Sequence, residues 1–125
     1  MIGLTCLAVA IYFEARSEPV AGQEAVAAVV LNRVEDERYP DDICSVVFEP
    51  KAFSFTHDGK SDRLPKNEAA EVAMSVAKEA LDGEKMSITS THYHTTSIKP
   101  FWASHFDLDS QVGNHLFYTN NTPYK

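Results

Sequence analysis

The stretch from Leu4 to Phe13 is almost entirely apolar, and it runs directly into the charged residues Glu14 and Arg16. It is shorter than the roughly 20 residues that a membrane-spanning helix requires, and it lacks the basic leader of a secretory signal. Some of its residues follow helical spacing and form one apolar stripe, while others cover most of the remaining circumference. The stretch therefore predicts a buried helix from about Leu4 to Arg16, around which the rest of the chain has to pack.

The remaining periodicity predicts helices first and strands last. Apolar residues at helical spacing indicate helices at about 21–34 and 66–82, the second capped by Gly83. The Asp41-Asp42 pair predicts the cap of a short helix through Val46 or Val47. Segments with period-two alternation predict strands at about 86–95 and 113–118, and a polar loop fills 49–65. We therefore expect an α+β fold over residues 1–125 as one domain, with helices in the N-terminal two-thirds and a small antiparallel β-sheet near the C-terminus.

The 125 residues carry a formal net charge of −7. This charge argues against nucleic acid as a partner, and it disfavours simple adhesion to an anionic membrane or wall polymer. No apolar run is long enough for membrane insertion, and we expect a monomer. An anionic partner would have to be held by local chemistry, because the overall field repels it.

The two cysteines, Cys6 and Cys44, match no zinc-binding spacing and no Cys-x-x-Cys redox motif. A disulfide between them would contribute roughly 3 to 4 kcal/mol in the chain-entropy model. Two buried thiols in a reducing compartment are an equally open interpretation.

Glu14 is the first candidate for a catalytic residue. It lies at the flank of the apolar stripe and in the last turn of the expected helix, beside the negative end of the helix dipole. Partial burial and that dipole both favour a raised pKa, which a general acid working near neutral pH needs. The alternative is a surface glutamate, or one paired with Arg16 or Arg33. Glu18 could supply the second carboxylate of a glycosidase pair, or could be a solvated loop residue.

The C-terminal third holds most of the histidines. His92, His94, His105 and His115 could in principle coordinate zinc, but no HExxH-type motif accompanies them. The preferred interpretation is a polar groove in which Tyr93, Trp102 and Tyr118 offer flat faces to a sugar ring. We therefore expect no metal and no other cofactor.

Several segments resemble the SleB-type cell wall hydrolases, which include spore cortex-lytic enzymes and phage lysins. The most specific is the run from Ala10 to Pro19, followed by Gly22-Gln23 and by the segment from Ala25 to Val34. Weaker similarities follow in the family's order: Tyr39-Pro40 with Ile43 and Val46-Val47-Phe48, then Phe53-Ser54, then Gly113 with His115, Phe117 and Tyr118. One departure is Ser17, where the family usually has glycine.

The resemblance implies a lysozyme-like catalytic domain that cleaves peptidoglycan strands between N-acetylmuramic acid and N-acetylglucosamine. The family glutamate of the Tyr-x-Glu-[Ala/Ser]-Arg motif maps onto Glu14. Family members are described as lytic transglycosylases, in which one glutamate acts first as acid and then as base and forms a 1,6-anhydro product. The candidates for substrate binding are Tyr12, Glu18, Asn32, Phe53, Ser54, Tyr93, His94, Trp102 and His115.

Three alternatives remain beside this hypothesis. A conventional muramidase would cleave the same bond with water, helped by Glu18 or Asp58. A zinc amidase or peptidase would use the histidines, and a non-catalytic module would bind the glycan without cutting it. The expected place of action is the cell wall. With no signal peptide visible, we expect either a phage-type lysin made in the host cytoplasm or an excised domain.

Overall fold

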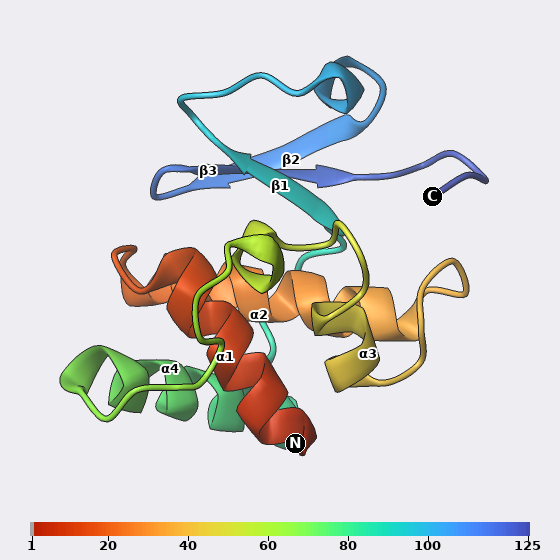
Figure 1. Ribbon diagram of the computed structural model, residues 1–125. Coiled ribbons are helices and arrows are strands. Elements are labelled where there is room, and N and C mark those ends of the chain that lie inside the picture. Colours follow the sequence, from red (N-terminus) through yellow and green to blue (C-terminus); the bar gives the residue numbers. More distant parts are fainter. Residues whose placement is uncertain (1) are drawn as a thin grey trace.

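The computed structural model describes residues 2–125, the side chain of His57 excepted. A layer of helices lies beneath a small sheet, and the two layers follow each other along the chain (Figure 1). The helices are α1 (Gly3–Ala15), α2 (Val20–Glu35), α3 (Ile43–Val47) and α4 (Glu68–Glu79). Shorter helical turns are η1 (Ser54–His57), η2 (Ala80–Glu84) and η3 (Phe101–Ser104). The α+β class expected from the sequence is confirmed.

Helix α1 is the centre of the helical layer, as its composition predicts. Every residue from Cys6 to Tyr12 is buried, so the helix has no solvent face along its middle. It packs against α2, α3 and α4. Phe13 and Phe55 stack on each other with ring centroids 5.1 Å apart, which fixes η1 against the end of α1. The loop predicted over 49–65 therefore contains one ordered turn, held by its aromatic residues.

The helix boundaries follow their caps. Asp42 accepts a hydrogen bond from the Ser45 backbone N–H at 2.8 Å and caps α3, as predicted. Asn67 caps α4 in the same way through Ala70. Gly83 was expected to cap the helix predicted over 66–82. It adopts a φ of 97°, the left-handed conformation that glycine adopts without steric cost, and it interrupts the helical backbone inside η2, which continues from α4.

The sheet consists of β1 (His92–Thr95), β2 (Asp107–Val112) and β3 (His115–Thr119). All neighbours are antiparallel and β3 lies in the middle. Two sequence-based expectations were wrong here. The strand predicted over 86–95 begins only at His92, and β2 was not predicted at all.

The shortened strand has a specific cause at the end of α2. The Asn32 side-chain amide donates hydrogen bonds of 2.9 Å to the carbonyls of Ile88 and Ser90. Arg33 donates one of 2.8 Å to the carbonyl of Thr91. These carbonyls are satisfied by helix side chains rather than by a neighbouring strand, so residues 86–91 tie the sheet to the helical layer. At the end of this segment, the Thr91 backbone N–H donates to the Tyr118 carbonyl of β3 at 3.0 Å.

One disulfide stabilises the helical layer, and one apolar cluster joins this layer to the sheet. Cys6 in α1 and Cys44 in α3 form a disulfide, which decides the question left open by the sequence. A second apolar cluster joins α2 to β3 around the fully buried Phe117, with Val26 and Val29 beneath it. Among the described residues, no helix is both long and apolar enough to cross a membrane.

Candidate active site

Glu14 lies in the last turn of α1, and it is partly buried. Its Oε1 accepts a short hydrogen bond from the hydroxyl of Tyr93 in β1, which is 79 positions away in the sequence. The helical layer thus supplies the carboxyl group and the sheet supplies its donor. The geometry places the glutamate predicted to be catalytic where the two layers meet.

The surroundings of Glu14 favour its protonated form. Burial raises the pKa of Glu14 above its ordinary value. The hydrogen bond from Tyr93 and the positive charge of Arg33 lower the pKa by smaller amounts, so that burial dominates. A carboxyl group with a raised pKa keeps its proton closer to neutral pH, and it can therefore donate that proton to a leaving group.

Two neighbouring rings pack against the ring of Tyr93. The ring centroids of His115 and Phe117 lie 5.0 Å and 5.4 Å from that of Tyr93. Burial, followed by the neighbouring Glu14, holds the pKa of Tyr93 well above its ordinary range. Tyr93 therefore remains a neutral hydroxyl that donates to Glu14 over the whole working pH range.

Replacing Tyr93 with Phe tests this coupling. The variant keeps the ring packing but removes the donor, so the pKa of Glu14 is expected to rise further. Activity that depends on a protonated Glu14 falls as pH rises through that pKa, so the alkaline limb of the pH–rate profile should move to higher pH. The rate of glycan cleavage measured across pH for wild type and Tyr93→Phe checks this. An alkaline limb that stays in place or moves to lower pH would refute the coupling.

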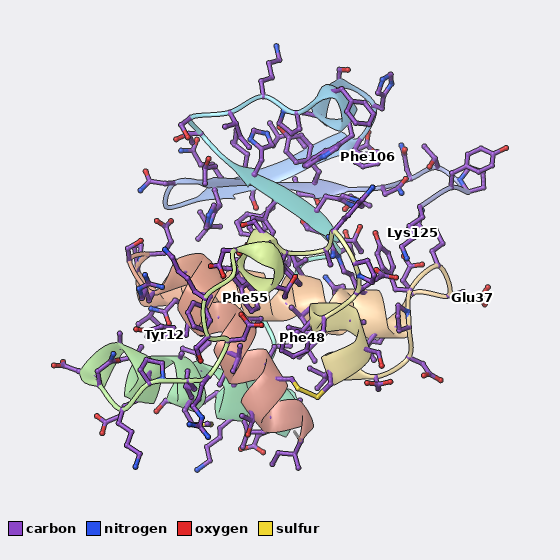
Figure 2. The ribbon with its side chains drawn as sticks, viewed as in Figure 1. Tyr12, Glu37, Phe48, Phe55, Phe106 and Lys125 are labelled. Carbon is purple, nitrogen blue, oxygen red and sulfur yellow. A yellow bond between two sulfur atoms is a disulfide. The ribbon has the colours of Figure 1, made fainter. Side chains whose placement is uncertain are left out.

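A cavity of about 540 Å³ adjoins Tyr93. Its lining comes from the end of α2, the loop 49–52, β1, η3 and the C-terminal residues 122–125. Tyr39, Trp102 and Phe106 contribute aromatic faces, and Figure 2 shows Phe106 at the same end of the molecule as Lys125, another lining residue. Glu14 does not line this cavity. Tyr93 touches both and therefore connects the carboxyl group to the hollow.

Glu18 has a different environment from Glu14. Its carboxylate accepts hydrogen bonds from the Asn114 backbone N–H at 2.7 Å and from the Asn114 side chain at 3.3 Å. The preceding residue, Gly113, has a φ of 59°, and a Cβ there would collide with Glu18 Oε1. Glu18 thus fastens the β2–β3 turn to the loop between α1 and α2.

His115 completes this side of the site. Its Nδ1 lies 3.9 Å from Glu18 Oε1, and it is buried without a hydrogen-bond partner among the described residues. Burial lowers the pKa of His115 and Glu18 raises it by less, so the imidazole is neutral near pH 7. The contact with Glu18 is therefore not an ion pair under those conditions.

Both the sequence and the fold of the chain are similar to those of known proteins. The sequence profile of the cell wall hydrolases matches residues 17–118. The catalytic domain of SleB from Bacillus cereus superposes with a TM-score of 0.81 at 32% identity, over 94% of this chain and 89% of that one. The chain belongs to the cell wall hydrolase family. The resemblance seen in the sequence is thereby confirmed, although the matched segment begins after Glu14 and does not test that residue.

Other relatives of this cell wall hydrolase carry more specific names. The spore cortex-lytic enzyme of Halalkalibacterium halodurans is 37% identical over 112 residues, which are 89% of this chain and 33% of that protein. A solved structure of the catalytic domain of the germination-specific lytic transglycosylase SleB from Bacillus anthracis has a TM-score of 0.81 at 32% identity, and it covers 94% of this chain and 93% of that one. The chain spans about a third of the length of the full-length Halalkalibacterium relative.

The hydrolase brings only some of the sequence candidates together. Tyr93 contacts Glu14 and His115, while Trp102 shares the cavity with Tyr93. His94 is buried on the other face of β1, where its Nε2 lies 2.9 Å from the Tyr118 hydroxyl. Ser54 is exposed at the start of η1.

The other candidates have partners within the fold. The hydroxyl of Tyr12 accepts a hydrogen bond from Asn67 at 3.2 Å, on the side of α1 that faces α4. Asn32 is committed to the carbonyls before β1, and Lys85 donates to its Oδ1 at 2.8 Å. Phe53 is buried, with the guanidinium carbon of Arg33 lying 5.5 Å from its ring centroid. Among the described residues, no hydrogen bond joins any of these three side chains to Glu14.

Among the described residues, no cluster of three or more His, Cys, Asp or Glu side chains could hold a metal ion. The zinc alternative therefore gains no support from the geometry. Sequence reasoning missed Arg33 as a residue of the cavity. The signal was available, because residue 33 falls on the same inward face of α2 as Val26, Val29 and Val30.

Proposed function

We propose that this cell wall hydrolase cleaves the glycan strands of peptidoglycan between N-acetylmuramic acid and N-acetylglucosamine, with Glu14 as its catalytic acid and base. The observation that carries the proposal is the pairing of a partly buried Glu14, whose pKa is raised, with the Tyr93 hydroxyl beside an aromatic cavity. The comparisons support it through the names of the relatives, two of which are SleB catalytic domains. Residues 1–125 would act at the cell wall as one catalytic domain and as a monomer.

The proposed reaction is that of a lytic transglycosylase. Protonated Glu14 donates its proton to the glycosidic oxygen, and the bond from that oxygen to C1 of the muramyl residue breaks. The resulting Glu14 carboxylate then accepts the proton of the muramyl 6-hydroxyl, whose oxygen forms a bond to C1. The products are a free N-acetylglucosamine end and a 1,6-anhydromuramyl end, and Glu14 has regained its proton.

This mechanism requires no second carboxylate, which agrees with the surroundings of Glu14. Both oxygens of Glu18 are occupied by Asn114, and Asp58 is exposed and accepts a hydrogen bond from the Lys60 backbone N–H. Neither residue is joined to Glu14 by a hydrogen bond. The alternative, a muramidase that uses water, would need one of these carboxylates to change partners.

The masses of the released muropeptides test the proposal. Purified peptidoglycan is digested with the wild-type chain, and the fragments are analysed by mass spectrometry. Products lighter by one water than reducing-end muropeptides are expected, since the anhydro ring forms in place of hydrolysis. Products of full mass would instead support the muramidase. Release of stem peptides from intact strands, sensitive to chelation, would support the zinc amidase, and binding without any fragments would support a non-catalytic module.

A further inference from the structure

Arg33 is a buried cation that makes no direct ion pair with a carboxylate among the described residues, although its charge acts on Glu14. Its side chain is on the last turns of α2, and only 8% of the residue is exposed. Its Nε donates to the Thr91 carbonyl at 2.8 Å, and its guanidinium carbon lies 5.1 Å and 5.5 Å from the ring centroids of Tyr39 and Phe53. Within residues 2–125, none of the ion pairs includes Arg33. Burying a charged group in this way costs desolvation free energy unless an anion pairs with it.

Arg33 also lines the cavity that adjoins Tyr93. Two lysines, Lys51 and Lys125, line the same cavity, and the single carboxylate in the lining, Glu49, pairs with Lys125. The lining thus carries three cations against one anion. In a chain whose formal net charge is −7, this is a local reversal of sign. The side chains of the cavity lining therefore suit an anionic ligand, although the chain as a whole is acidic.

His92, Trp102 and Phe106, which also line the cavity, carry no charge. Burial lowers the pKa of His92 to about 4, and the charges of Arg33 and Arg38 act in the same direction. His92 is therefore neutral at working pH and can only contribute hydrogen bonding. Trp102 and Phe106 stack on each other, with ring centroids 5.6 Å apart, and form an aromatic wall beside it. The cavity thus combines a sugar-sized aromatic face with one deep, fixed guanidinium.

We propose that this cavity is a binding site for a carboxylate carried on the lactyl arm of the muramyl residue, with Arg33 as its principal ligand. The inference rests on the proposed function, because the position of the carboxylate follows from Tyr93. This residue touches both Glu14 and the cavity, so a muramyl residue at the cleaved bond would lie close to the cavity, and the proposal places its lactyl arm toward Arg33. The planar guanidinium matches a carboxylate in geometry as well as charge.

Two sources can supply that carboxylate. It belongs either to the peptide stem attached to the lactyl group or, on a strand without stems, to the lactyl group itself. Both present the same planar anion, and the site requires only that it lies on the lactyl arm. Four substrates distinguish them: glycan strands with stems, strands freed of stems by an amidase, and each of these after carbodiimide coupling with ammonia. The coupling converts carboxylates to carboxamides of nearly equal size without their charge.

The initial rate of anhydro-product formation is measured on all four with the wild-type chain. Loss of one charge-assisted pair is expected to lower kcat/KM roughly 10- to 100-fold on the amidated form of whichever substrate carries the ligand. A loss only on stem-bearing strands assigns the site to the stem, and a loss on stem-free strands assigns it to the lactyl carboxylate. A change smaller than about twofold on both would overturn the inference while leaving the proposed function standing. Absence of anhydro products from every substrate would reject the proposed function instead.

Variants of Arg33 test independently whether this residue binds the carboxylate. Arg33→Met should lower the rate on native strands to the rate on amidated strands. Arg33→Lys keeps a positive charge, so it should keep part of the difference in rate between native and amidated strands. Lys78→Met, on the exposed face of α4, removes an equal charge away from the cavity and should change neither rate. A folded Arg33→Met variant that still discriminates between the substrates contradicts the assignment. Where circular dichroism shows that Arg33→Met does not fold, the wild-type comparison alone decides.

Discussion

Glu14→Gln is expected to lower the rate of peptidoglycan cleavage by about 10²- to 10⁴-fold, the range typical of a lost general acid. Glutamine keeps the shape of the side chain and an oxygen that can accept the hydrogen bond from Tyr93. It has no proton of suitable acidity to donate to the glycosidic oxygen. Because the variant also removes a carboxyl group whose ionisation burial disfavours, its unfolding temperature should be unchanged or slightly higher. Initial rates of fragment release and a thermal melt measure both effects.

The matched control is Glu79→Gln, an exposed residue at the end of α4, which should cleave at the wild-type rate. Glu18→Gln is informative in another way, because it weakens the contact with Asn114 without touching Glu14. A folded Glu14→Gln variant that retains wild-type activity would remove Glu14 from its catalytic role. If Glu18→Gln alone abolished cleavage, the search for the acid would move to that residue.

Removal of the Cys6–Cys44 disulfide is expected to cost about 3 to 4 kcal/mol of unfolding free energy in the chain-entropy model. The bond joins residues 38 positions apart, and it fixes α3 against the buried start of α1. For a domain of this size the cost corresponds to a fall in melting temperature of roughly 10 to 20 °C. Chemical denaturation of the Cys6→Ala/Cys44→Ala double variant, with a parallel thermal melt, provides the measurement.

Reductant offers the control for this second prediction. Wild type melted in reductant should approach the double variant, whereas the double variant itself should not respond. Cys6 precedes Glu14 by about 12 Å along the helix axis, so the folded variant should keep its rate of cleavage at low temperature. Equal stability of the oxidised wild type and the double variant would show that the bond contributes nothing to the folded state.

The helices could be predicted from the sequence because each is encoded locally. The apolar circumference of residues 6–12 is that of a buried helix, and the caps at Asp42 and Gly83 rest on short-range chemistry. These features depend on neighbours within a few positions. The prediction of α1, α2, α3 and α4 therefore held to within a few residues.

The sheet was harder because its strands depend on distant partners. Residues 107–112 are mostly exposed and polar, so β2 has no alternating apolar pattern to reveal it. Residues 86–91 have such a pattern, yet Asn32 and Arg33 bind their carbonyls from the helical layer. A prediction from the local sequence pattern cannot include these distant partners, which are β3 for β2 and the end of α2 for residues 86–91.

The same distinction applies to the site. The partial burial of Glu14 could be predicted because the residue lies at the end of an apolar helix. Its donor Tyr93 was among the candidates, but the contact between them spans the two layers. The link between Glu18 and Asn114 likewise joins two loops that nothing in the sequence pairs.

The close fit of Glu18 against Gly113 has a consequence for how this sequence can change over time. A side chain at position 113 would meet Glu18 Oε1 and would also occupy a φ of 59°. Shortening residue 18 first removes the collision, but the cost of the left-handed backbone remains, roughly 1 to 2 kcal/mol for most residues and less for asparagine. The two positions are therefore expected to change in a fixed order: loss of the glutamate comes first, and replacement of the glycine follows, with asparagine as its most accessible replacement.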